Sequence, residues 1–324
     1  MIGVVGATGE VGSHAVRVLR DLDVGPLRLG GSRDVDHRDD GSLDRFAAGC
    51  RVLVNCSGPA HAVGDRVARA ALRAGAGYVD ASEVDGPGVT GAGLRPGLTG
   101  LLPRWLARRE FDAVHGLVAH LAVLDRFTAT AAADYLHASD SEPLAAWREG
   151  KVSGVLTRRT GVALPFLADE VTLLPHLGRE EERLAAALKL ARGDWYTAVS
   201  GEHVRTAFDR ARTLDHADAV AALVRASALD LAGREPHVVL AVRLDGVSGS
   251  EPITRTAVLR GRGNGELTGA LTALAVLAVD RGEALSGFAA EVLDPEVTLA
   301  RLAECGIASP FVVEGELSVE EGAL

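Results

Sequence analysis

Lysine, cysteine and long apolar stretches are scarce in this chain of 324 residues. Lys151 and Lys189 are the only lysines, and an acidic excess gives a formal net charge of -10. A nucleic-acid partner is not expected, because binding a phosphate backbone needs a basic face and no basic stripe occurs. The longest apolar stretch, residues 267–279, is too short to cross a bilayer, so we predict a buried helix there and no membrane span.

The three cysteines, Cys50, Cys56 and Cys305, follow no paired CxxC spacing. Their small and odd number argues against a disulfide framework. The histidines form neither an H-E-x-x-H motif nor a Cys/His cluster, so no metal site is predicted. The first residues show no charged region followed by an apolar signal core. From the few cysteines we expect a reduced, cytoplasmic compartment.

Glycine is plentiful, and its spacing near the start of the chain is informative. Residues 2–5 predict a buried strand, apolar residues at helical spacing predict a helix from about residue 11, and GATGEVG lies between the two. Glycines allow a tight turn and a close approach of phosphate to the backbone, and the helix start attracts the anion. The pattern predicts a dinucleotide site with the following cofactor-binding residues: Gly6, Thr8, Gly9, Glu10, Val11 and Gly12.

The end of the second predicted strand, near residues 27–29, indicates which dinucleotide binds. An acidic residue there hydrogen-bonds the ribose 2′-OH of NAD, whereas an arginine accommodates the 2′-phosphate of NADP. Ser32 and Arg33 occupy this place, and Asp34 follows them. We therefore expect NADP(H), bound by Ser32 and Arg33, with NAD(H) as the alternative if Asp34 makes the acidic contact.

Strands and helices alternate through the first hundred residues. We expect a strand at 35–37, a helix at 42–48 capped by Ser42, a buried strand beginning at 51, a helix ending at Gly75 and a strand at 78–81. Such alternation predicts a parallel sheet whose ligands bind at the carboxyl ends of its strands. The residues at those ends that we assign to the cofactor are Cys56, Ser57, Gly58, Pro59 and Ser82.

The pattern changes after a Gly- and Pro-rich loop at 86–103. The expected elements are strands at 113–124 and 128–136, helices at 179–192 and 215–232, and an antiparallel pair at 237–244 and 253–260 joined by a loop beginning at Asp245 and Gly246. This mixture predicts a second, α+β domain. The fold class is thus α/β, a Rossmann-type doubly wound parallel sheet with a second α+β domain.

The chain resembles the saccharopine dehydrogenase-like (saccharopine reductase) family. The resemblance is carried by GATGEVG, VLVNCSGP at 52–59, AGAGYVDASE at 74–83 and GLRPGL at 93–98, with weaker similarity at 134–136 and 266–295. It implies an NAD(P)-binding Rossmann domain at 1–110 to which 266–310 returns, and a substrate domain at 111–265 that forms a homodimer. The sequence departs from the family pattern in two places. The link from Glu83 to Gly93 is shorter than is usual in the family, so one helix of the nucleotide-binding domain is expected to be missing. In addition, Ala81-Ser82-Glu83 replaces the usual Gly-Glu ending of the strand.

The resemblance further implies hydride transfer, most often to the C=N bond of an imine derived from an amino acid. Such a reduction needs an acid that protonates nitrogen, and our candidates are Glu83, Asp134 and Tyr135. Reduction of C=C or C=O, or a sensor that binds NADP without turnover, are the alternatives. Cys56 is expected to pack rather than to react. His120 is either a base or a structural histidine.

An arginine fork for a substrate carboxylate could come from several positions. The sequence offers Arg95, Arg126, Arg158, Arg159 and Arg243. The short-chain reductases share a similar opening motif and use a Tyr followed by a Lys four residues later. No tyrosine here has that lysine, so their chemistry is excluded.

Overall fold

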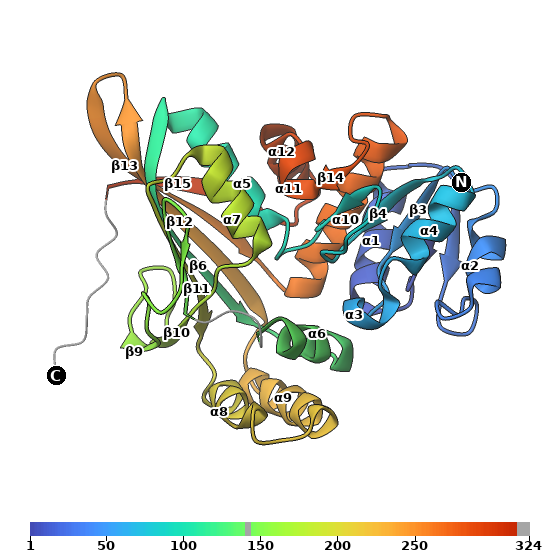
Figure 1. Ribbon diagram of the computed structural model, residues 1–324, viewed down its shortest axis with the longest axis horizontal. Coiled ribbons are helices and arrows are strands. Elements are labelled where there is room, and N and C mark those ends of the chain that lie inside the picture. The colour runs from blue at the N-terminus through green and yellow to red at the C-terminus, as the bar shows by residue number, and fades with distance from the viewer. Residues whose placement is uncertain (140–143, 316–324) are drawn as a thin grey trace. The chain divides into compact units, whose positions relative to one another are not determined.

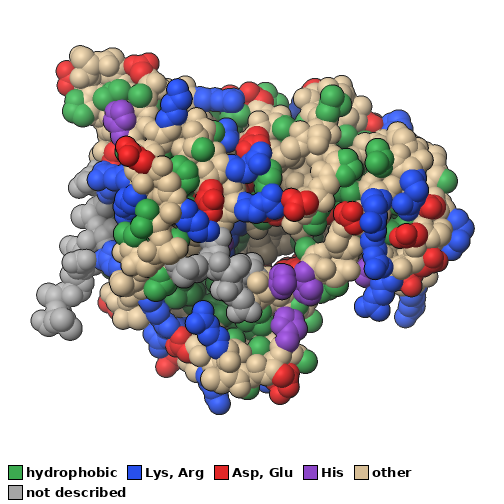
Figure 2. Space-filling view, in the orientation of Figure 1, with side chains coloured by type: hydrophobic (Ala, Val, Ile, Leu, Met, Phe, Trp, Pro, Cys, Tyr) green, Lys and Arg blue, Asp and Glu red, His purple; other side chains and the backbone are tan. Residues whose placement is uncertain are grey.

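A computed structural model describes residues 1–139 and 144–315 of the chain. These residues form two compact units: Met1–Leu101 with Asn264–Ala308, and residues 102–263 with 309–315 (Figure 1). The helix α5 (Leu98–Glu110) begins in the first unit and continues into the second. Within the described part, no helix combines the length and apolarity needed to span a bilayer. Acidic and basic side chains are interspersed on the face that Figure 2 shows.

The first unit is built on a six-stranded parallel sheet with the order β14-β5-β4-β3-β1-β2. Its strands are β1 (Ile2–Val5), β2 (Leu27–Gly30), β3 (Val52–Asn55), β4 (Gly77–Asp80), β5 (Val89–Thr90) and β14 (Gly287–Phe288). Its helices are α1 (Glu10–Asp21), α2 (Asp40–Ala47), α3 (Ala60–Val63), α4 (Arg66–Arg73), α10 (Asn264–Asp280), α11 (Ala289–Val292) and α12 (Pro295–Glu304). The predicted Rossmann-type parallel sheet is confirmed.

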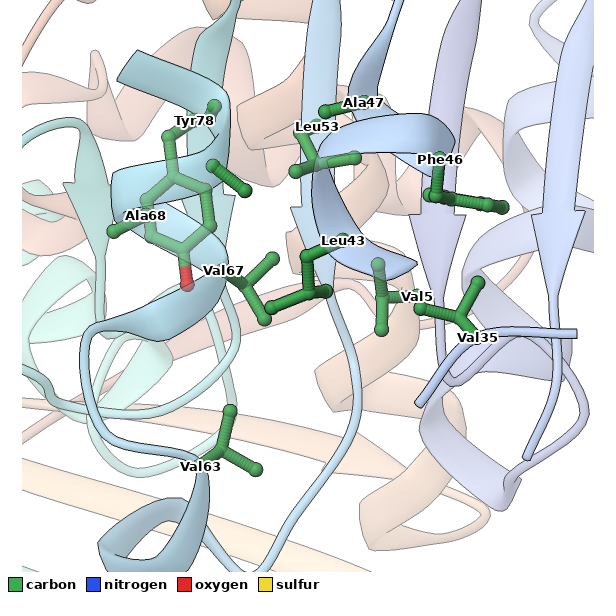
Figure 3. Packing of buried hydrophobic residues seen from close by; sticks show 12 residues of the cluster. Val5, Val35, Leu43, Phe46, Ala47, Leu53, Val63, Val67, Ala68 and Tyr78 are labelled. Carbon is green, nitrogen blue, oxygen red and sulfur yellow. The ribbon is translucent and has the colours of Figure 1, made fainter. Parts of the chain in front are cut away.

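Helices cover both faces of this sheet. On one face, α2 and α4 bury Leu43, Phe46 and Val67 against Val5 and Leu53 of the strands (Figure 3). Each such large side chain contributes roughly 1.5–3 kcal/mol by leaving water. The other face is packed by α1 and α10, which meet at a glycine: a Cβ at Gly269 would lie 2.6 Å from both the Cβ of His14 and the carbonyl oxygen of Val11.

Two expectations for the first unit were wrong. Residues 35–37 form no strand. They follow a turn at 32–34, in which the N–H groups of Asp34 and Val35 both donate to the carbonyl of Gly31, and they lead into a second turn at 37–38. The chain therefore passes directly into α2. Asp39, rather than Ser42, caps that helix, since the Asp39 carboxylate accepts from the N–H groups of Gly41 and Ser42. The loop at 86–103 also contains the short strand β5 and the start of α5.

The second unit is built on a mixed sheet with the order β15-β13-β12-β6-β11-β10-β9, to which β7 and β8 add at β11. Its strands are β6 (Ala113–Leu124), β7 (Ala146–Arg148), β8 (Lys151–Val152), β9 (Arg159–Val162), β10 (Val171–Pro175), β11 (Arg192–Val199), β12 (His237–Ser248), β13 (Glu251–Gly261) and β15 (Pro310–Glu314). Its helices are α6 (Ala129–Ser139), α7 (Arg179–Leu188), α8 (Glu202–Ala211) and α9 (His216–Leu231). The predicted α+β character is confirmed.

The predicted strand at 128–136 is instead the helix α6. Four of its first five residues are alanine, the best helix former, and the side chain of Thr128 accepts from the N–H of Ala131 at the start. The helix α7 ends at Leu188, earlier than expected, because Lys189 takes a left-handed conformation. The antiparallel pair β12–β13 is confirmed, but Asp245 and Gly246 lie inside β12 and the turn follows Ser248.

Candidate cofactor site

The strand order of the first unit contains a switch point. From β1 the chain runs to β2 on one side and then reaches β3 on the other side through α2. The two crossovers therefore diverge at the carboxyl ends of β1 and β3, which is where open α/β sheets bind ligands. The two ends are joined by a hydrogen bond of 2.9 Å from the N–H of Cys56 to the carbonyl of Val5.

The glycine-rich turn after β1 leaves no room for side chains at two positions. Gly6 has a φ of +78°, and a Cβ there would lie 2.7 Å from the carbonyl carbon of Cys56. A Cβ at Gly12 would lie only 2.1 Å from the carbonyl oxygen of Gly6. Since all of these obstacles are backbone atoms, neither glycine can be replaced without moving the turn.

The residues present fit a dinucleotide pyrophosphate. Thr8, Gly9 and Glu10 are exposed at the start of α1, and Gly9, the N-cap, supplies no side-chain acceptor. The first N–H groups of a helix have no acceptor within the helix, so they are available to an anion at its positive end. The Glu10 side chain packs against Gly265, where a Cβ would lie 2.6 Å from its Cγ.

The loop after β2 lies beside this turn. The N–H groups of Gly6 and Ala7 both donate to the carbonyl of Gly30, at 2.8 and 3.0 Å. Ser32 and Arg33 are exposed, and Arg33 makes no hydrogen bond or ion pair with any residue that the structure describes. The carboxylate of Asp34, in contrast, accepts from the N–H of Gly31 at 2.9 Å.

A buried polar network, absent from our sequence analysis, fixes the carboxyl ends of β3 and β4. The amide of Asn55 donates to Asp80 at 2.9 Å, the hydroxyl of Tyr78 donates to the same oxygen, and the N–H of Ser82 donates to the other oxygen. Asp80 is fully buried and Asn55 nearly so. The network thereby positions the loops that carry Ser57 and Ser82, because Asn55 also accepts from the N–H and hydroxyl of Ser57.

Burial and the nearby Asp80 carboxyl control two titratable groups in this region. Burial, followed by Asp80, raises the pKa of the Cys56 thiol to about 12. Burial and then Asp80 also raise the pKa of Tyr78 well above its ordinary value. A thiol that stays protonated is a poor nucleophile, which agrees with a packing role for Cys56.

The three candidate proton donors lie on different units. Glu83 is half-buried and follows β4 in the first unit, in a stretch from 81 to 88 that forms no helix. Asp134 and Tyr135 are half-buried in α6 of the second unit. Tyr135 also stacks on Phe208 with 4.8 Å between ring centroids, so it has a packing role besides any catalytic one.

The turn at 93–98 completes the first unit. Gly97 has a φ of +132°, and a Cβ there would lie 2.2 Å from the carbonyl oxygen of Gly93. Two threonines of α10 hold the turn: the N–H of Leu94 donates to Thr268 at 3.1 Å, and Thr272 donates to the carbonyl of Ala92 at 2.8 Å. Residues from two distant parts of the sequence are thus joined within this unit.

Known proteins were compared with the chain by sequence and by structure. No protein-family model and no curated protein matches it. Apo saccharopine dehydrogenase (L-Glu forming) from Saccharomyces cerevisiae is similar in structure, with a TM-score of 0.67 and 14% identity over 96% of this chain and 99% of that chain. DAP dehydrogenase of C. glutamicum in complex with DAP has a lower TM-score of 0.41 at 13% identity, over 94% of this chain and 98% of that chain. The resemblance to the saccharopine dehydrogenase-like family is confirmed at the level of the fold.

Proposed function

We propose that this chain is an NADP(H)-dependent oxidoreductase that reduces the C=N bond of an imine derived from an amino acid. The observation that carries the cofactor assignment is the glycine turn at the sheet's switch point, where backbone atoms exclude any Cβ at Gly6 and Gly12. The fold shared with a saccharopine dehydrogenase supports the reaction class by analogy. The cofactor, when bound, supplies the hydride.

The preference for NADP(H) rests on the loop after β2. Arg33 is exposed there, so its guanidinium can form a charge-assisted, bidentate contact with a 2′-phosphate. Asp34 is the acidic residue that would select NAD, but its carboxylate accepts a hydrogen bond from Gly31. A ribose 2′-OH would have to compete with that bond.

Fluorescence titration with NADPH and NADH tests this preference. We expect Arg33→Ala to weaken NADPH binding about 10- to 100-fold, the equivalent of one charge-assisted contact of about 1.5–3 kcal/mol, and to leave NADH binding unchanged. Arg38→Ala is the matched control, because Arg38 is another exposed arginine of this loop and its hydrogen bonds use main-chain atoms: its carbonyl accepts from Arg66, and its N–H donates to Asp36. An unaltered cofactor preference in Arg33→Ala would refute the assignment.

Proton donation is proposed for Glu83, Asp134 and Tyr135, each of which carries an acidic or hydroxyl proton donor. Mixtures of amino acids with keto acids provide candidate imines, and nicotinamide absorbance reports their reduction. A Glu83→Gln, Asp134→Asn double variant that keeps the full rate would remove both carboxylates from the mechanism, and Tyr135→Phe tests the phenol.

The same assay distinguishes the proposed imine reductase from two alternative functions. Reduction of C=C or C=O substrates, with imines untouched, would favour the alternative reductase. Tight NADPH binding without turnover of any of these substrates would favour a sensor. We also propose, on the family resemblance, that the chain forms a homodimer through its second unit, which sedimentation can check.

A further inference from the structure

The second unit contains a cavity of about 80 Å³ on one face of its mixed sheet. Its floor comes from three neighbouring strands, β6, β12 and β13. His120 of β6 lies opposite Ala241 of β12, and Arg243 of β12 lies opposite Thr256 of β13. Alternate residues of a strand share a face, so these four side chains point to the same side of the sheet. Every described residue that lines the cavity belongs to this unit.

The cavity is covered by the segment 164–167, which adds two leucines, a proline and a phenylalanine to its wall. This cover is attached to the rest of the unit at two points. Arg260 of β13 donates to the carbonyl of Phe166 at 3.3 Å, and Asp169, just beyond the cover, forms an ion pair with Arg234. One water needs roughly 10–15 Å³, so the space beneath the cover takes several waters or a small organic molecule.

One polar group in this largely apolar wall lacks a partner. Thr256 is 3% exposed, and its hydroxyl forms no hydrogen bond with any residue that the structure describes. The large majority of buried polar side-chain atoms are hydrogen-bonded, because an unbonded group has lost its water without a replacement. A ligand atom in the cavity would supply the missing bond. Since a hydroxyl both donates and accepts, Thr256 can bond to the hydroxyl of a ligand in either direction.

The charges beside Thr256 disfavour an anion. Arg243 donates to Asp245 at 3.3 Å, and Asp245 also accepts from Arg192 at 2.9 Å. The guanidinium of Arg243 is therefore already engaged by a carboxylate of its own unit. An anion that entered the cavity would lose its hydration without gaining a counter-charge of its own.

The other polar group of the cavity, His120, shows that a cation is disfavoured as well. Its ring stacks on Tyr196 with 5.5 Å between centroids. Burial, followed by Arg159 and Arg243, lowers the pKa of His120 to about 4, so the imidazole is neutral near pH 7. The burial and the positive charges that disfavour a proton on His120 would equally disfavour a cationic ligand beside it.

We propose that this cavity binds a small neutral molecule with an apolar body and one hydroxyl group. The ligand hydroxyl bonds to the hydroxyl of Thr256, and the apolar body packs between Val239 and Ala241 of the floor and Leu164 and Phe166 of the cover. Ligand pockets commonly combine an apolar lining with a few polar groups that fix the orientation of the ligand. The inference goes beyond the proposed function, because neither the binding site nor its test involves the cofactor.

NMR titration of the full chain, without cofactor, tests the class of ligand. The neutral probes are phenol and benzyl alcohol. Toluene and ethylbenzene are their matched controls, in which a methyl group replaces the hydroxyl, and benzylamine and benzoate are the charged controls. We expect both neutral probes to bind, and benzyl alcohol to bind about tenfold or more tightly than either charged compound. Failure of both neutral probes to bind, or equal affinity for benzyl alcohol and benzoate, would overturn the proposal.

Two substitutions of Thr256 test the hydrogen bond. Thr256→Val keeps the shape of the side chain and removes the hydroxyl, so the affinity for phenol relative to that for toluene should fall about fivefold. Thr256→Ser keeps the hydroxyl, and its ratio of the two affinities should stay within about twofold of the wild-type ratio. Thr298→Val, at a buried threonine of α12 in the other unit, is the matched control. An unchanged ratio in Thr256→Val would show that the ligand does not bond to Thr256 and would overturn the proposal.

A substitution on the cavity floor locates the bound probes. Ala241→Leu adds bulk without altering a polar group and should weaken the binding of phenol and toluene at least about tenfold. Thermal unfolding checks that the variant is folded, and Ala241→Val, a smaller enlargement, takes its place if it is not. Unchanged affinities in the folded variant would put the probes at another site and contradict the proposal.

Discussion

The two units of this chain build their candidate sites from different chemical groups. In the first unit the part of the site that fits a pyrophosphate is made of main chain, with glycines that admit no Cβ and N–H groups at the start of a helix. In the second unit it is made of side chains that three paired strands place on one sheet face. A main-chain site is lost when the backbone moves, whereas a side-chain site can be changed one group at a time.

Gly12→Ala should break the main-chain site most completely. Its Cβ would lie 2.1 Å from the carbonyl oxygen of Gly6, and relief requires the turn and α1 to separate. We expect NADPH affinity to fall at least about 100-fold and the free energy of unfolding to drop by about 3 kcal/mol, as for overpacked cores. Cofactor titration and urea denaturation measure the two effects.

The matched control for that variant is Gly49→Ala. Gly49 has a φ of +76° in the same unit, but a Cβ there would meet nothing within 4 Å. This substitution should cost about 1 kcal/mol of backbone strain and leave cofactor affinity unchanged. If Gly12→Ala and Gly49→Ala bind NADPH equally well, the turn is not the pyrophosphate site.

The stability of the buried polar network at the ends of β3 and β4 should depend strongly on Asp80. Asp80→Ala leaves the amide of Asn55, the hydroxyl of Tyr78 and the N–H of Ser82 without their acceptor. Losing a buried charged acceptor should lower the free energy of unfolding by about 3–5 kcal/mol. Tyr78→Phe removes only one of these donors and should cost about 1 kcal/mol; equal losses in the two variants would contradict a central role for Asp80.

His120 should make the second unit sensitive to acid. Because its pKa is lowered to about 4, the folded state binds the proton less well than the unfolded chain, whose histidine has a pKa near 6.5. The associated stability is complete above about pH 6.5 and is lost as the pH falls towards 4, by an amount on the order of 3 kcal/mol at most.

Comparison of the wild type with His120→Gln isolates this effect from other titrating groups. Urea denaturation at pH 7, 6 and 5 should show a smaller decrease in stability for the variant. Parallel pH curves for the two proteins would mean that His120 titrates normally in the folded state.

Local patterns predicted the elements of the first unit better than those of the second. The strand, glycine turn and helix at residues 2–21 are continuous in sequence and were found there. The strand expected at 35–37 was wrong because the N–H groups of Asp34 and Val35 are used in a turn on the carbonyl of Gly31. The strand expected at 128–136 was wrong because four of the first five residues of α6 are alanine, the best helix former.

Site residues that depend on strand pairing could not be found from sequence. Asn55 and Asp80 each end an apolar run, but only the β3–β4 register places them opposite one another. Likewise, Arg243 and Thr256 meet through the β12–β13 pairing. The register of neither strand pair can be predicted from a single sequence. The network and the cavity could therefore be identified only from the folded chain. Polar residues that end buried strands are the signal that could have pointed to Asn55 and Asp80.

The smallest effect is expected for Cys56, the cysteine beside the glycine-rich turn. Burial raises its thiol pKa to about 12, and burial also raises the pKa values of Cys50 and Cys305. Iodoacetamide should therefore modify the folded chain slowly at pH 8, and the rate should keep rising beyond pH 10, because only the thiolate reacts. Cys56→Ser should change NADPH affinity by less than about threefold. Rapid labelling of Cys56 at pH 7, detected by mass spectrometry, would instead show a reactive thiolate.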